Sequence, residues 1–147
     1  MTDRLRVLLP MDGSPSALRA VRHIIELAGR GLAVELHLLN AQAPVRGSAA
    51  ALIAQGELND YHREEGMKTL AAAQVLVEQA GLPMHLHVGV GNAGEIALAF
   101  ARRLGCQQIV MGTRGLGSVA GMIMGSVARH VIAGSDVPVT LVRAPHS

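Results

Sequence analysis

The chain has 147 residues, half of them hydrophobic and 16% charged, so it holds enough apolar surface to fold and is not of the disordered class. This is the length of one ordinary domain, and we expect a single domain over residues 1–147. The net charge of +2 comes from scattered residues, and aromatic side chains make up 1% of the chain. Both features exclude the basic patches and stacking platforms of nucleic-acid-binding proteins.

The remaining composition favours a cytoplasmic protein. No apolar run approaches the roughly 20 residues that a bilayer requires, and residues 1–6 lack the apolar stretch of a signal peptide. We therefore expect no membrane partner. The single cysteine, Cys106, excludes an internal disulfide, and it follows a helix end, where the helix dipole makes a reactive thiolate unfavourable.

Short apolar runs alternate with segments of helical periodicity along the chain. Strands are expected at 5–10, 33–40, 84–90, 108–112 and 137–142, and helices at 15–28, 57–80, 93–104 and 126–133. Ser14, Asn92 and Ser126 stand where N-caps belong, and Pro15 suits a first helical position. Five strands that alternate with four helices predict an α/β fold with a mainly parallel, doubly wound sheet. Ligands of such sheets bind beyond the carboxyl ends of the strands.

The strongest local motif runs from Gly112 through Gly115 to Gly125 and Ser126, between a predicted strand and a predicted helix. Glycines allow backbone amides to approach a ligand, and the first turn of the helix would direct N–H groups at an anion. Arg114 adds a positive charge. The motif therefore predicts a phosphate cradle, and the alternative is a flexible loop with an ordinary serine cap. It is not a P-loop, because Ser118 stands where the lysine is required.

Residues 89–94 match the G-x-G-x-x-G pattern of dinucleotide-binding proteins. The match lies in the third strand–helix unit rather than the first, and no acidic residue follows about 20 residues later. Gly89 also falls inside a predicted strand. A tight turn with Asn92 as N-cap is the favoured interpretation.

Polar residues outside the glycine motif give weaker predictions of function. Asp12, after the first strand, suits a ribose or base contact, but it also suits an Asx turn. His85 and His87 share one strand face at a spacing that suits a metal, yet no third ligand is near in sequence. We expect a solvated strand face there, and no metal site.

The spacing Gly112-x2-Gly115-x9-Gly125-Ser126 resembles the G-2x-G-9x-G-(S/T) signature of ATP-binding universal stress proteins. Residues 7–20 and 135–143 resemble the first and last strands of that family with the adjoining turns. The resemblance implies strand order 3-2-1-4-5 and a cofactor of ATP, alone or with Mg²⁺. The implied binding residues are Pro10, Asp12, Ala41, Met111, Gly112, Arg114, Gly115, Gly125, Ser126 and Val127.

The resemblance also implies a regulatory module that acts by nucleotide-dependent association with a partner not yet identified. One alternative is a slow ATP-hydrolysing or nucleotidyl-transferring enzyme, although no activating lysine, general base or carboxylate pair stands out. Another is a dimerisation module of the branch that binds no nucleotide, which lacks the glycine motif present here.

Family members often form homodimers through their last strands. In the implied order, the strand at 137–142 is an apolar edge that carries Val137, Val139 and Leu141 and lacks a protective lysine. We expect it to pair with its copy in a homodimer, while Pro138 removes one ladder donor and limits open-ended growth.

Overall fold

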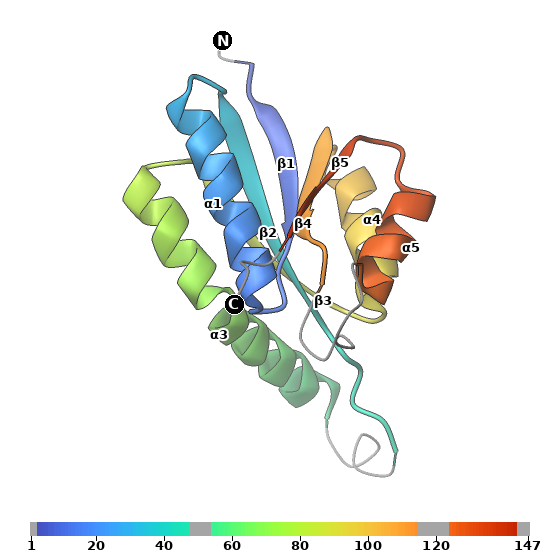
Figure 1. Cartoon of the computed structure of the whole chain (residues 1–147). Coiled ribbons are helices and arrows are strands. Elements are labelled where there is room, and N and C mark those ends of the chain that lie inside the picture. The colour runs from blue at the N-terminus through green and yellow to red at the C-terminus, as the bar shows by residue number, and fades with distance from the viewer. Residues whose placement is uncertain (1–2, 48–53, 115–123, 144–147) are drawn as a thin grey trace.

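The computed structural model describes residues 3–47, 54–114 and 124–143. It contains a five-stranded parallel sheet in the order β3-β2-β1-β4-β5, which confirms the predicted fold and strand order (Figure 1). The strands are β1 (Leu5–Pro10), β2 (Val34–Gln42), β3 (Met84–Val90), β4 (Gln108–Gly112) and β5 (Val139–Val142). The helices of the described residues are α1 (Pro15–Gly29), α3 (Gln55–Ala80), α4 (Ala93–Arg103) and α5 (Ser126–Gly134).

Helices cover both faces of the sheet (Figure 1). Side chains of β1 and β2 alternate between the faces, so that Val7 and Leu36 pack against α1 and α3, whereas Leu8 and Leu39 pack against α4 and α5. All four are essentially inaccessible to solvent. Burial on both faces explains why the strand sequences are aliphatic runs. No helix in the described part of the chain has the length and hydropathy that a membrane crossing needs.

Two of the three predicted helix caps are confirmed. Ser14 Oγ accepts a hydrogen bond from Ala17 N at the start of α1, and Asn92 accepts one from Glu95 N at the start of α4. The predicted cap at Ser126 is wrong, because Gly125 occupies the N-cap position.

The N-terminus of α5 is fixed by the backbone of Gly125. Its N–H donates to Thr113 O at 2.6 Å, and its carbonyl accepts from Arg129 N at 3.1 Å. Both bonds make Gly125 the last residue before the helix and shift Ser126 into the first turn. Glycine is tolerated at an N-cap, although it offers no side-chain acceptor.

Two strand boundaries differ from the prediction. β5 begins at Val139 rather than at residue 137, because Ser135 Oγ bonds to both the N–H and the carbonyl of Val137 and holds it in a turn. β2 continues to Gln42, since Ala41 and Gln42 are paired with the end of β3. Ala41 is therefore inside the sheet rather than after it.

Candidate functional site

The candidate site lies where the order of the parallel strands reverses. From β1 the chain proceeds outward to β2 and β3, whereas β4 lies on the other side of β1 and leads to β5 (Figure 1). Such a switch point opens a crevice at the carboxyl ends of the two central strands. Here those ends are Pro10 of β1 and Gly112 of β4.

Beyond β1, Asp12 forms the predicted Asx turn. One carboxylate oxygen accepts a hydrogen bond from Ser14 N at 2.9 Å, and Gly13 between them has a φ of +83°. The turn leads directly into α1, whose N-cap is Ser14. Asp12 remains exposed at the surface, so the Asx turn positions this carboxylate beside the switch point.

Asn40 links the ends of β1 and β2 and was missed by the sequence analysis. Its side chain is 4% exposed and donates to Met11 O at 2.8 Å, while its own oxygen accepts from Gln42 Nε2 at 2.7 Å. It therefore fixes the backbone that leads into Asp12. The available signal was a polar residue that ends an otherwise apolar run.

At the end of β4, Gly112 lies directly against the first turn of α1. A Cβ atom at Gly112 would come within 2.8 Å of the carbonyl carbon of Ser16 and would also meet its hydroxyl. Ser16 Oγ donates to Val142 O at 3.0 Å, which ties α1 to β5. Packing alone therefore requires glycine at residue 112. The side chain of Met111 is buried in the core against α4 and α5, so only its backbone faces the site.

The two ends of the glycine motif meet in space. The bond from Gly125 N to Thr113 O joins residues twelve positions apart, and Thr113 N donates to Val142 O at 3.0 Å. Arg114 follows Thr113 and is partly buried. The predicted site residue Gly115 lies outside the described residues.

The N-terminus of α5 has the properties of an anion site. Its cap, Gly125, makes no side-chain hydrogen bond to the helix. Ser126 is exposed and Val127 is partly buried at the next position. The amides of this first turn, supported by the helix dipole and by Arg114, suit a phosphate group.

The competing G-x-G-x-x-G segment has a packing explanation. A Cβ atom on Gly89, within β3, would lie 2.7 Å from Ile96 Cγ2 and 3.0 Å from Phe100 Cε1. Gly91 has a φ of +147°, which favours glycine in the turn that leads to α4. These glycines allow α4 to approach β3, in keeping with the favoured turn interpretation.

The expected solvated face at His85 and His87 is correct for only one of them. The side chain of His85 is 54% exposed. His87 is partly buried, with Nε2 3.0 Å from Nδ1 of the buried His37 on β2. The sequence analysis missed His37 because pairing between β2 and β3, rather than closeness in sequence, brings it to this face.

The glycine motif and the fold agree with a match to a family model. The model of the universal stress protein family matches residues 4–143. The chain belongs to the universal stress protein family. A relative from Methanocaldococcus jannaschii, universal stress protein MJ0531, is 28% identical over 145 residues, which cover 95% of this chain and 82% of the relative.

Solved structures of related proteins share the architecture. The structure of MJ0577 is 25% identical, superposes with a TM-score of 0.83, and matches 99% of this chain and 100% of its own. A universal stress protein in complex with cAMP is also 25% identical, with a TM-score of 0.68 and coverage of 98% of this chain and 100% of its own. One of these similar proteins is thus known with a nucleotide bound.

Proposed function

We propose that this universal stress protein binds ATP at the switch point and acts as a regulatory module through nucleotide-dependent association. The observation that carries the proposal is the closure of the glycine motif by the bond from Gly125 N to Thr113 O. It brings the uncapped first turn of α5 beside Gly112 and Arg114. The cAMP complex of a similar protein supports a nucleotide as the ligand class.

In this proposal the phosphates lie against the amides of Ser126 and Val127, with Arg114 as a counter-charge and Mg²⁺ bound to the phosphates. The adenosine lies toward Asp12 and the backbone of Ala41. This orientation places the phosphate anions at the N-terminus of α5 and the ribose hydroxyls near the Asp12 carboxylate, which can accept hydrogen bonds from them. Gly115 and Gly125 serve close backbone approach by the phosphates.

Two measurements test the site. Mass spectrometry of small molecules released from the purified protein should find ATP or a product of it. Calorimetry should then show that Gly115→Val and Gly125→Val abolish ATP binding while circular dichroism shows a folded protein. Gly56→Val is the matched control, because nothing lies within 4 Å of a Cβ atom there. Ser126→Ala should weaken binding less than either glycine variant, since the amide is retained.

Unchanged ATP affinity in a folded Gly125→Val protein would contradict the phosphate assignment. A dinucleotide in the purified protein would favour the G-x-G-x-x-G interpretation instead. If the wild type turns over ATP and the glycine variants do not, the proposal of a regulatory module would be replaced by that of a slow ATP-hydrolysing or nucleotidyl-transferring enzyme.

We further propose a homodimer in which β5 pairs with its copy. β5 is the last strand of the sheet, and on its β4 side the carbonyl of Pro138 accepts from Ile109 N and that of Val142 accepts from Thr113 N. Residues of one strand point alternately to its two neighbours, so Val139 and Leu141 direct their backbone groups outward. Pro138 therefore lacks its donor on the β4 side, and the expectation that it limits growth at the outer edge is wrong.

Val139→Pro tests this interface, because it removes an outward N–H and proline is tolerated on an edge strand when that N–H faces solvent. The matched control is Val139→Ala, which shortens the side chain and keeps the donor. Light scattering at micromolar concentration should show a dimer for the wild type and Val139→Ala, and a monomer for Val139→Pro. A monomeric wild type, with and without ATP, would refute the dimer.

A further inference from the structure

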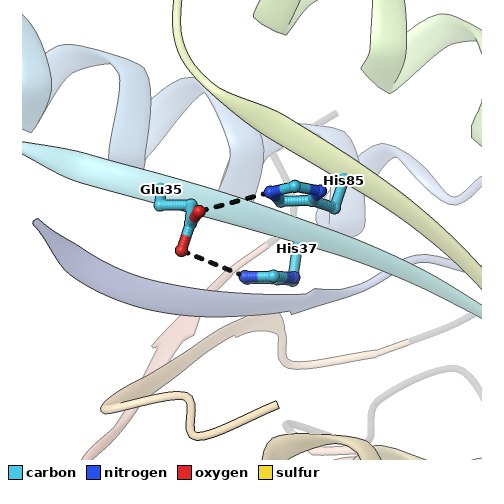
Figure 2. A group of neighbouring side chains, drawn as sticks. All are labelled: Glu35, His37 and His85. Atoms are coloured by element: carbon cyan, nitrogen blue, oxygen red, sulfur yellow. Dashed lines mark hydrogen bonds and ion pairs between the residues drawn. The ribbon is translucent and has the colours of Figure 1, made fainter.

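A cluster of side chains of metal-ligating type lies at the end of the sheet opposite the switch point. Glu35 and His37 are two residues apart on β2, and His85 on β3 is the register partner of His37. All three point to the sheet face that α4 and α5 cover further along. Figure 2 shows the Glu35 carboxylate directing one oxygen to each histidine ring.

The distances within the cluster suit a small divalent ion. Oε1 of Glu35 lies 3.2 Å from Nε2 of His85, and its Oε2 lies 3.5 Å from Nε2 of His37. Ligand atoms at ~2.0–2.1 Å from a tetrahedral zinc ion are about 3.3 Å apart. One ligand atom from each residue lies within 4.8 Å of the other two.

One ring nitrogen of His37 is buried and poorly satisfied. The residue is 6% exposed, and its Nε2 makes no well-formed hydrogen bond within the described residues, with Glu35 Oε2 at 3.5 Å. A buried polar atom without a partner costs free energy. A metal ion between His37 and Glu35 would satisfy it.

The other ring nitrogen of His37 is already oriented. Nδ1 lies 3.0 Å from Nε2 of His87. When Nε2 binds a metal, the proton of the neutral ring resides on Nδ1, which then donates to His87. Metal-binding histidines characteristically donate their second N–H to such an acceptor, which fixes the tautomer and the ring orientation.

Burial lowers the pKa of both His37 and His87. Burial raises the pKa of Glu35, but its interactions with the rings of His85 and His37 outweigh this effect and lower the pKa below its ordinary value.

Two arginines lie near the cluster but have partners elsewhere. Arg6 on β1 donates through Nε to Gly105 O at 2.9 Å. Arg103 on α4 stacks its guanidinium 4.2 Å from the centre of the Phe100 ring. Their charges oppose a cation, whereas Glu35 supplies the negative charge in direct contact.

We propose that Glu35, His37 and His85 form a binding site for a divalent transition-metal ion, with Zn²⁺ as the ion that best fits two imidazoles and one carboxylate. His87 acts as a positioning residue behind His37. Because the side chain of His85 is 54% exposed, the fourth coordination position opens to solvent and can accept water or a donor from a partner.

The test is calorimetric titration of the metal-free full chain with Zn²⁺, without nucleotide. Glu35→Gln and His85→Ala change side chains that are not fully buried, so both variants should fold. The matched control is His130→Ala, an exposed histidine on α5 outside the cluster. We expect one tight Zn²⁺ per chain, and a loss of affinity of at least about tenfold in either cluster variant, since even outer-shell changes cost 10–100-fold.

Co²⁺ provides a second readout, because its visible absorption reports inner-shell nitrogen and oxygen ligands. The wild type and His130→Ala should give the same spectrum, and His85→Ala should lose it. Absence of stoichiometric Zn²⁺ binding, or equal affinity in the two cluster variants and His130→Ala, would overturn the proposal. Both readouts are independent of ATP, so failure of the nucleotide proposal would leave this result unaffected.

Discussion

Gly112→Ala should destabilise the protein although it adds a single methyl group. The new Cβ atom would lie 2.8 Å from both the carbonyl carbon and the Cβ atom of Ser16, and would also meet its hydroxyl. The clash involves backbone, so α1 must move away from β4. Overpacking of this kind costs about 1–3 kcal/mol.

Two further effects adjust this figure. Displacement of Ser16 breaks its hydrogen bond to Val142 O, which costs about 1 kcal/mol. Replacement of glycine reduces the entropy of the unfolded chain and returns about 0.4–1 kcal/mol. The net expectation for Gly112→Ala is a loss of about 1–4 kcal/mol in the free energy of unfolding.

Urea unfolding of four proteins measures the effect: the wild type, Gly112→Ala, Ser16→Ala and the double variant. Ser16→Ala alone should lower the free energy of unfolding by about 1 kcal/mol. The double variant should lose less stability than the sum of the two single variants, because Ser16→Ala removes the hydroxyl that a Cβ atom at Gly112 would meet. If the free energy of unfolding of Gly112→Ala lies within about 0.5 kcal/mol of the wild-type value, which is the usual range for surface substitutions, the packing argument is refuted. Loss of ATP binding in Gly112→Ala is therefore a poor test of the phosphate site, and Gly115 and Gly125 are the better positions.

Three other predictions concern buried polar groups. Cys106 is 5% exposed and burial raises the pKa of its thiol to about 11, so iodoacetamide at pH 8 should modify it only at the rate of unfolding; rapid modification of the native protein would contradict this. The lowered pKa values of His37 and His87 mean that the unfolded chain, with a value near 6.5, binds protons more strongly. In EDTA the free energy of unfolding should be nearly constant between about pH 7 and 8, below the range in which the thiol of Cys106 titrates in the unfolded chain, and it should fall as the pH drops below 6.5. A His87→Gln variant should show a smaller fall. Asn40→Ala leaves Met11 O without its buried donor and should lower unfolding stability in urea by about 1–3 kcal/mol; a neutral result would show that water replaces the amide.

The parts of the fold that were predictable depend on local patterns. Ser14 and Asn92 predict where α1 and α4 begin, because the side chain of an N-cap residue accepts a hydrogen bond from a backbone N–H only three residues later. The glycine motif is likewise contiguous in sequence. Ser126 shows the limit of such patterns, because the hydrogen bond that fixes the true cap at Gly125 comes from Thr113, twelve residues earlier.

Features that depend on register could not be predicted in the same way. His37 and His85 are 48 positions apart, and only the pairing of β2 with β3 places them side by side. A shift of one residue would send them to opposite faces of the sheet. Sequence distance therefore concealed the group Glu35, His37 and His85, which differs from the pair of His85 and His87 that the sequence suggested.

The two proposed sites lie at opposite ends of the same strand. Six positions of β2 separate Glu35 from Ala41, which corresponds to about 20 Å at ~3.3 Å per residue. Sites at this separation without shared partners contribute nearly independently to binding and stability. The chemistry also differs, since phosphate would be bound by backbone amides and the metal by side chains. A glycine variant that loses ATP should therefore keep its Zn²⁺ affinity in a calorimetric titration, and a changed Zn²⁺ affinity in that variant would show that the two sites are coupled along β2 or the helices that cover it.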